Sequence, residues 1–205
     1  MKRFIAMMTF ALLATGLSAQ DIALPKPRTT GGKPLMEALN LRATNRNIAE
    51  LPLSLEHLSN LLWAATGINR PDGRMTAPTA SNNQEIGVYV FLPQGVYLYD
   101  VKEHSLLFKL AGDHRAATAS RGTPSGVLLV YVADYGRMGR YDDASKEFYS
   151  ATDTGFVSQN VYLYCASEGL ATVVLGQVNR PAVVELLNIT NGKVTLGQPV
   201  GYPAN

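Results

Sequence analysis

The chain has 205 residues, of which 46% are hydrophobic and 17% charged, and its 18 basic residues nearly balance its 16 acidic ones. These proportions are typical of one globular domain with a substantial core. They argue against a nucleic-acid-binding or membrane-surface protein, which would carry a basic stripe. The single cysteine, Cys165, excludes an internal disulfide and a cysteine-based metal site, and we expect it to be a small core residue.

The first 19 residues have the features of a secretory signal peptide. Lys2 and Arg3 precede an apolar run from Phe4 to Leu17, and small residues around Ala19 suit a signal peptidase. The run is shorter than the roughly 20 residues of a membrane span, and no second run is long enough. We therefore expect an exported protein, periplasmic or secreted, cleaved near Ala19. An uncleaved N-terminal anchor is the alternative.

The chain after the leader begins with an arm and two helices. Residues 20–33 are rich in Pro, Gly and Thr and predict an extended, mobile arm. Pro34 suits the first turn of a helix, and the leucines that follow predict a helix over residues 34–44. Ser54 as an N-cap and Gly67 as a terminator bound a second apolar stripe, which predicts a second helix between them.

From Gly87 the spacing of the hydrophobic residues changes to one typical of β-strands. Residues 87–92 and 96–99 flank a Pro-Gln-Gly turn and predict a hairpin, and residues 105–110 predict a third strand of the same meander. The Val- and Leu-rich residues 127–132 predict a buried strand.

The second half predicts further helices and strands without a regular βαβ rhythm. The expected elements are helices at 141–152, 156–169 and 181–187 and strands at 171–175 and 194–202. A mixture of this kind predicts the α+β class.

The motifs of several enzyme classes are absent. His57, His104 and His114 form no metal-binding pair, and the chain has no serine-hydrolase elbow, Ser-x-x-Lys, Walker loop or GxGxxG after a strand. The triplet Asp113-His114-Arg115 predicts a solvated helix start rather than an acid–base site. If the protein is an enzyme, a cofactor would supply the chemistry, so no side chain is nominated as catalytic.

Three segments suggest a flavin site. In the first, Arg42 and Arg46 lie four residues apart at the predicted helix end, with Thr44 between them, so both guanidinium groups would project to one side. Such donors suit a phosphate dianion. The alternative is a solvated helix end, where arginines are favoured by the helix dipole.

The other two segments are less specific by themselves. Residues 74–84 form a polar stretch whose side-chain amides, all within residues 78–84, can contact the pyrimidine edge of a flavin ring. A helix cap is the alternative. Residues 168–176 turn from a helix at Gly169 into a strand that ends on Gly176, which would expose backbone N–H groups to a flat ligand. Ordinary core is the alternative there.

Together and in this order, the segments resemble the nitroreductase superfamily, most closely its SagB-type, thiazole-oxidase-like dehydrogenases. The resemblance covers residues 34–205 and implies one nitroreductase-like domain with a central mixed or antiparallel sheet flanked by helices, in an intertwined homodimer. It implies FMN as cofactor. The implied cofactor-binding residues are Arg42, Ala43, Thr44 and Arg46 for the phosphate, Pro78, Thr79, Ala80, Asn82 and Gln84 from the partner subunit, and Val174, Leu175 and Gly176 for flavin N5 and O4.

The resemblance also implies an activity. Family members pass electrons through flavin N5 in a ping-pong scheme, usually from NADH or NADPH, to a small organic molecule such as a nitroaromatic or quinone. Because those nucleotides are cytoplasmic, an exported copy would use another donor or run as a dehydrogenase. Many members carry a further base near the C-terminus on the phosphate, whereas this chain has none after Lys193, so we expect weaker FMN binding. The alternative function is a secreted binding or scaffold module that has lost flavin chemistry.

Overall fold

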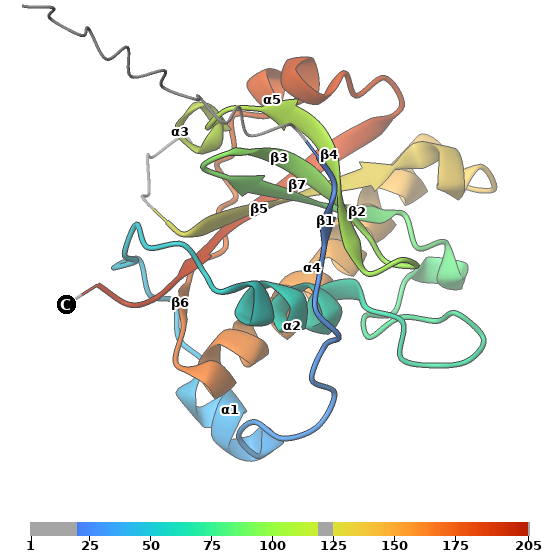
Figure 1. The fold of residues 1–205 in the computed structure, drawn as a ribbon. Coiled ribbons are helices and arrows are strands. Elements are labelled where there is room, and N and C mark those ends of the chain that lie inside the picture. The colour runs from blue at the N-terminus through green and yellow to red at the C-terminus, as the bar shows by residue number, and fades with distance from the viewer. Residues whose placement is uncertain (1–19, 119–124, 205) are drawn as a thin grey trace, which may run out of the picture.

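The computed structural model describes residues 20–118 and 125–204, and the predicted signal peptide lies outside them. The described chain forms a seven-stranded sheet in the order β1-β4-β3-β2-β5-β7-β6, with helices on both of its faces (Figure 1). This arrangement confirms the α+β class. Every pair of neighbouring strands is antiparallel, so of the two expected sheet types the antiparallel one is found.

The elements alternate irregularly along the chain. The strands are β1 (Ile22–Ala23), β2 (Ile86–Leu92), β3 (Gly95–Asp100), β4 (Ser105–Ala111), β5 (Val127–Asp134), β6 (Ala171–Thr172) and β7 (Gly192–Gly201). The α-helices are α1 (Leu35–Leu41), α2 (Leu55–Thr66), α3 (Arg115–Thr118), α4 (Asp143–Glu168) and α5 (Arg180–Leu187), with short 3-10 turns η1 (Ala80–Asn82) and η2 (Tyr135–Met138).

The predicted meander forms the centre of the sheet. β2 and β3 pair as a tight hairpin with Leu92 opposite Gly95, and β4 follows against β3. Gly95 is required at this turn because a Cβ atom there would lie 2.7 Å from the carbonyl oxygen of Leu110. β5 pairs with β2 on one side and β7 on the other, so the Val-rich strand is central, as its composition predicts.

The sheet carries a core on each face. The larger core packs the sheet against α2 and α4, and it includes Leu61, Leu62, Val88, Val90, Leu129, Tyr131, Val157 and Val161. The smaller core lies on the α5 face and includes Phe91, Val96, Leu128, Val130, Val183 and Val194. Within the described residues, no helix is long and apolar enough to cross a membrane.

Helix α2 confirms its predicted boundaries. The Ser54 side chain accepts a hydrogen bond from the His57 backbone N–H at 3.1 Å, which caps the first turn. Gly67 follows the last helical residue, and Leu58, Leu61 and Leu62 are buried, whereas Leu55 in the first turn is exposed.

Helix α4 corrects the prediction of two helices at 141–152 and 156–169. It runs without a break for 26 residues, through Asp153, Thr154 and Gly155. A glycine in a helix interior costs about 1 kcal/mol. Burial of Val157 and Val161 against the sheet, and the 3.0 Å hydrogen bond from Thr154 to Thr195 of β7, outweigh that cost.

The N-terminal arm is extended, as predicted, but it is docked onto the domain. Ile22 and Ala23 pair with β4 at the edge of the sheet. Further along, Arg28 forms a 2.7 Å ion pair with Glu168, and the Lys33 N–H donates to Ser167.

Candidate functional site

The first predicted segment leaves the helix earlier than the spacing suggested. Helix α1 ends at Leu41, so Arg42 and Arg46 do not lie on one helical turn, and this part of the prediction is wrong. The Asn45 N–H donates to the carbonyl oxygen of Thr172 at 2.9 Å, which draws the segment out of helical geometry and along β6. Arg46 is therefore exposed and Arg42 half-buried.

Tyr162 of α4 connects this segment to the rest of the fold. The guanidinium carbon of Arg42 lies 5.4 Å from the centre of the Tyr162 ring, within the range of a cation–π contact. The Tyr162 hydroxyl lies 3.0 Å from Thr44 Oγ1. Ala43 lies between these two contacts on the exposed side of the chain.

The third segment reaches the same tyrosine. The backbone N–H of Val174 donates to the Tyr162 hydroxyl at 2.9 Å. The predicted strand 171–175 is shorter than expected, since β6 ends at Thr172, and Leu175 then forms a separate bridge with Gly197. The exposed Gly176 follows, and its carbonyl accepts from Arg180. Val174 and Thr44 thus meet at one hydroxyl.

The second segment, residues 78–84, adopts a strained conformation. Ser81, Asn82 and Gln84 have φ angles of 52°, 55° and 52°, in the left-handed region that non-glycine residues rarely occupy. Inside the segment, Thr79 Oγ1 accepts from the Gln84 N–H at 2.9 Å.

Contacts to other elements hold the second segment in place. The Ala80 N–H donates to Asp153 of α4 at 2.8 Å, and Arg137 donates to the Gln84 carbonyl oxygen at 2.9 Å. The Gln84 amide nitrogen donates to the carbonyl of Gly73, while Pro78 is exposed. Part of the Gln84 amide is thus used within the chain.

One chain does not bring all three segments together. Asp153 holds the second segment, whereas Tyr162 holds the first and third. These two residues are nine positions apart on α4, which places them about 13 Å apart along the axis and on opposite sides of the helix. The first and third segments converge, and the second lies elsewhere.

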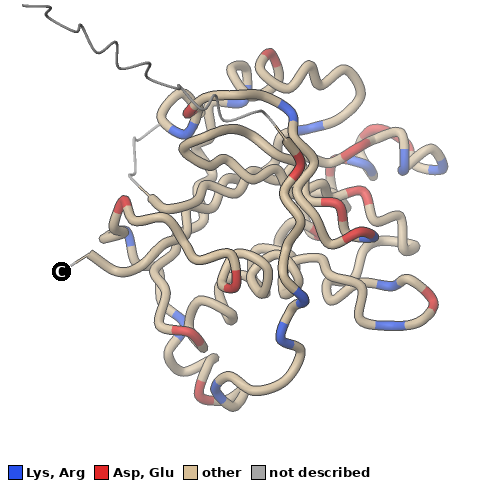
Figure 2. The backbone as a smooth tube through the Cα atoms, in the orientation of Figure 1, with Lys and Arg blue, Asp and Glu red and all other residues tan. Residues whose placement is uncertain are grey.

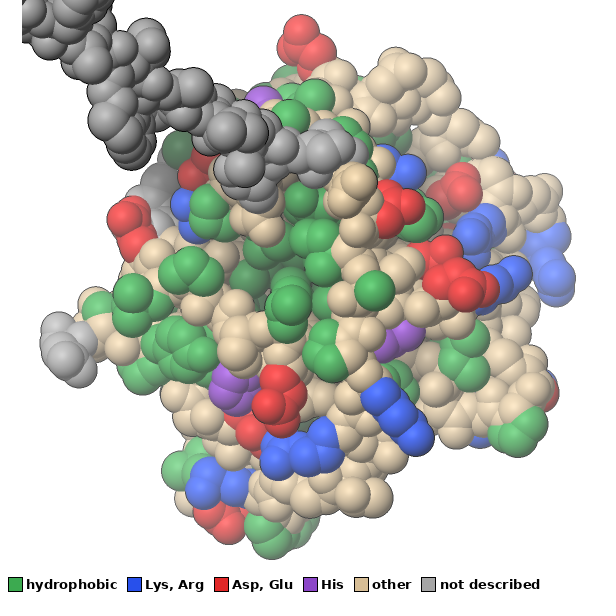
Figure 3. Space-filling view, viewed as in Figure 1, with side chains coloured by type: hydrophobic (Ala, Val, Ile, Leu, Met, Phe, Trp, Pro, Cys, Tyr) green, Lys and Arg blue, Asp and Glu red, His purple; other side chains and the backbone are tan. Residues whose placement is uncertain are grey.

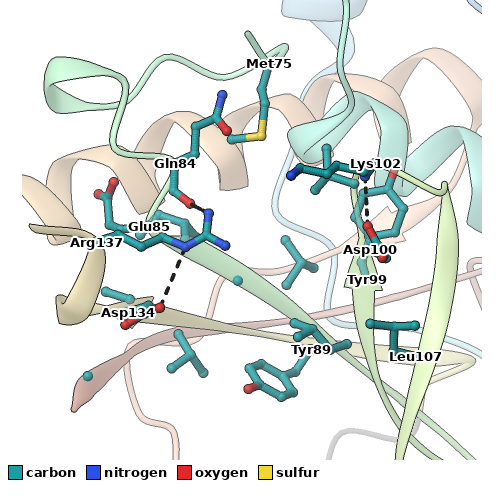
Figure 4. Close-up of a pocket in the computed structure, with 18 of the residues that line it drawn as sticks. Met75, Gln84, Glu85, Tyr89, Tyr99, Asp100, Lys102, Leu107, Asp134 and Arg137 are labelled. Atoms are coloured by element: carbon teal, nitrogen blue, oxygen red, sulfur yellow. Dashed lines mark hydrogen bonds and ion pairs between the residues drawn. The ribbon is translucent and has the colours of Figure 1, made fainter. Parts of the chain in front are cut away.

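A cavity of about 790 Å³ opens beside the second segment, at one end of β2, β3 and β5. Figure 4 shows Gln84, Glu85 and Arg137 at one end of it, and Asp100 and Lys102 at the other. Figure 2 shows charged residues of both signs gathered at this end of the sheet. The first and third segments do not line this cavity.

Sequence reasoning missed Tyr162, Asp153 and Glu85. Tyr162 lies outside the apolar stripe of its predicted helix. That position is the one sequence feature that indicates a contact outside the core. Asp153 is buried although it lies at a predicted helix break, so no local pattern indicated it. Within the described residues, no group of His, Cys, Asp and Glu side chains could hold a metal ion.

The fold is that of a known class. The Nitroreductase family model matches residues 40–202. A Methanocaldococcus jannaschii protein provisionally named a nitroreductase (MJ1384) is 32% identical over 180 residues, which cover 82% of this chain and 90% of that protein. The chain belongs to the Nitroreductase family.

Solved structures agree with this assignment. The crystal structure of a provisionally named nitroreductase from Ralstonia eutropha has a TM-score of 0.88 and 41% identity, and the alignment covers 94% of this chain and 93% of that one. The NADPH:FMN oxidoreductase of Vibrio harveyi, solved with NAD+, has a TM-score of 0.62 at 20% identity over 83% of this chain and 69% of that one. This second likeness is one of fold alone.

Proposed function

We propose that this protein is an FMN-dependent oxidoreductase. The observation that carries the proposal is the convergence of Arg42, Thr44 and the Val174 backbone on Tyr162. A cation and a hydroxyl suited to a phosphate thus lie beside the exposed strand end at Gly176, while the Val174 and Leu175 N–H groups already donate within the chain. Family membership and the FMN oxidoreductase among the structural neighbours support the same reading.

The donor set fits FMN. Arg42, Thr44 and Arg46 would hold the phosphate, and Arg46 is exposed and available for it. The backbone of Val174, Leu175 and Gly176 would face the ring. Bound FMN would supply electron transfer at N5, with donor and acceptor using the same face in turn, a ping-pong scheme. The Val174 N–H now donates to the Tyr162 hydroxyl, so it could donate to FMN only if that hydrogen bond were shared or broken.

The reaction partners are proposed by class. The substrate is a small organic molecule of the nitroaromatic or quinone type, and the electron donor is NAD(P)H or another reductant. The SagB-type branch of the family remains our assignment on the motifs of residues 42–46, 78–84 and 166–176. The Asp113–Arg115 helix start fits the same motif order.

A second copy of the chain would complete the site. Because residues 78–84 lie on the opposite side of α4 from Tyr162, we propose that they reach the flavin of a partner subunit in a homodimer. Phe148 and Phe156 lie eight positions apart on one face of α4 and are 65% and 44% exposed. Figure 3 shows further exposed hydrophobic side chains at the α1 end of the molecule. Within α1, the side chains of Leu35, Met36 and Leu39 are exposed. Apolar exposure of this extent is typical of an interaction face.

The dimer is tested by sedimentation velocity with and without FMN. Phe156→Asp is expected to shift the protein to a monomer and to weaken FMN retention. A wild-type monomer that binds one FMN would contradict the shared site.

The flavin proposal is tested by absorbance spectra after FMN addition and gel filtration. We expect one FMN per subunit. Arg42→Ala should raise the dissociation constant about 10- to 100-fold, the loss expected for a charged hydrogen bond. Arg74→Ala is the matched control, because Arg74 is exposed and pairs with Asp72 away from Tyr162.

The alternative function is a binding or scaffold module without flavin chemistry. The use of the Val174 N–H by Tyr162 favours it. No retained flavin and no thermal stabilisation by excess FMN would support this alternative. Reduction of a nitroaromatic or quinone by the FMN-loaded protein would support the oxidoreductase.

We also propose that the protein is exported and cleaved near Ala19. The proposal depends on the leader sequence, Lys2 to Ala19, which lies outside the described residues. N-terminal sequencing of the protein from the periplasmic or culture fraction tests it. An intact Met1 on protein recovered from the cytoplasm would contradict it.

A further inference from the structure

Glu85 is a buried acid whose carboxyl group has no donor partner of ordinary hydrogen-bond geometry. Its side chain is 1% exposed, and neither carboxyl oxygen accepts such a bond within the described residues. An unsatisfied buried carboxyl group is expensive in a folded protein and calls for an explanation. Glu85 directly follows the strained segment 78–84.

The acid that acts on the Glu85 carboxyl group is Asp153, itself only 3% exposed. Burial, and next the carboxyl group of Asp153, raise the pKa of Glu85 from 4.5 to about 7. The backbone N–H of Glu85 and, more weakly, Arg137 oppose this rise in pKa, and the Arg137 guanidinium group already contacts the Gln84 carbonyl and Asp134. Two ionised carboxylates here would repel each other with little compensation.

Asp153 also holds the second segment. Its Oδ2 atom accepts the 2.8 Å hydrogen bond from Ala80, while three residues of the segment keep left-handed backbone angles. Such angles are unfavourable for residues other than glycine and persist only when neighbouring contacts impose them. Any displacement of Asp153 would therefore loosen residues 78–84.

We propose that Glu85 and Asp153 share one proton, and that this proton locks residues 78–84 in place. Glu85 is thus a positioning residue, and Asp153 transmits its protonation state to Ala80. Loss of the proton would drive the two carboxylates apart and release the segment. The link to cofactor binding rests on the proposed function, which places this segment against a partner's flavin.

Amide hydrogen exchange of residues 78–85 at pH 6 and pH 8, in the protein without flavin, tests the lock directly. After correction for the intrinsic exchange rate, wild-type protection should fall about tenfold, as the deprotonated fraction of a group with a pKa of about 7 rises. Glu85→Gln, which keeps a neutral hydrogen-bonding group, should hold its protection at both pH values. Glu103→Gln, an exposed acid in the β3–β4 turn, is the matched control and should follow the wild type.

Thermal unfolding gives a second readout. Folding raises the pKa of Glu85, so the unfolded chain releases its proton first and stability falls as the pH rises from about 4.5 to about 7. Glu85→Gln should flatten this fall. If Glu85→Gln does not fold, Asp153→Asn serves instead, since it keeps an oxygen acceptor for Ala80. A wild-type profile without pH dependence, or a variant profile equal to it, would overturn the shared proton.

FMN titration at the same two pH values separates this inference from the proposed function. We expect wild-type affinity to fall about tenfold at pH 8 and Glu85→Gln affinity to stay constant. FMN binding with the same pH dependence in both proteins would overturn the link between the lock and the cofactor. No FMN binding at either pH would overturn the proposed function. The exchange data would still show whether Glu85 and Asp153 share a proton.

Discussion

The Tyr162 hydroxyl accepts a hydrogen bond from the backbone N–H of Val174 at 2.9 Å. The same hydroxyl lies 3.0 Å from Thr44 Oγ1, so it also pairs with the segment that follows α1. One phenol group therefore fixes two loops that are distant in sequence. Their relative position depends on the rigidity of α4.

Tyr162→Phe is expected to destabilise the protein by about 1–2 kcal/mol. The substitution keeps the ring under Arg42 but leaves the half-buried Val174 N–H without its partner. Urea unfolding at neutral pH measures the change. Tyr149→Phe is the control, because the Tyr149 hydroxyl makes no hydrogen bond within the described chain, and an equal loss in both variants would contradict the role of Tyr162.

Local elements were predictable where one short pattern decides them. Helix α2 follows from Ser54, a leucine stripe and Gly67, and all of that information lies within one stretch of sequence. Helix α4 was wrongly divided because Asp153 to Gly155 read as a break. The contacts that carry the helix through this point come from β7, more than 40 positions away in sequence, and no local period contains them.

The candidate site also has parts that local sequence predicts and parts that depend on distant contacts. The three segments are recognisable from the sequence, because each carries its own polar side chains or glycines. The sequence could not indicate Tyr162, because the contact with Thr44 spans 118 positions. Nor could it show that Arg42 leaves the helix, which depends on a backbone hydrogen bond between Asn45 and Thr172.

His104 is expected to make stability depend on pH. Its Nδ1 atom pairs with the Tyr99 hydroxyl at 2.8 Å, and its Nε2 atom lies 2.7 Å from Ser59 Oγ and 3.1 Å from the Pro25 carbonyl, so it ties the arm to α2 and β3. Burial lowers the pKa of His104 from 6.5. As the pH falls, the unfolded chain therefore takes up a proton before the folded one. The contribution of neutral His104 to the free energy of unfolding is complete above pH 6.5 and is lost as the pH falls below that value.

His104→Asn tests this expectation. Asparagine tolerates the positive φ of 48° at this position but cannot bridge all three partners. The variant should be less stable by about 1–2 kcal/mol at pH 7.5. The gap should narrow at pH 5.5 in urea unfolding, and a gap that does not change with pH would show that the imidazole is not the titrating group.

Cys165 is expected to be chemically inert in the folded protein. Its side chain is 1% exposed within the larger core, and burial raises the pKa of the thiol. The thiolate is the reactive form of cysteine. The raised pKa keeps the thiolate population small, and burial keeps alkylating reagents away from the sulfur. Mass spectrometry after iodoacetamide treatment at pH 8 should show labelling in denaturant only, and rapid labelling of the native protein would contradict the buried position.

The Tyr131–Gln198 pair is expected to be among the most sensitive polar contacts of the core. Both residues are 0% exposed, and the Tyr131 hydroxyl donates to Gln198 Oε1 at 2.6 Å between β5 and β7. Tyr131→Phe leaves that oxygen buried without a donor and should cost about 1–3 kcal/mol. Adding Gln198→Met removes the orphaned group at similar volume, so the double variant should recover part of the loss in urea unfolding. Strictly additive losses would show that the hydrogen bond itself contributes little and that packing around the two side chains dominates.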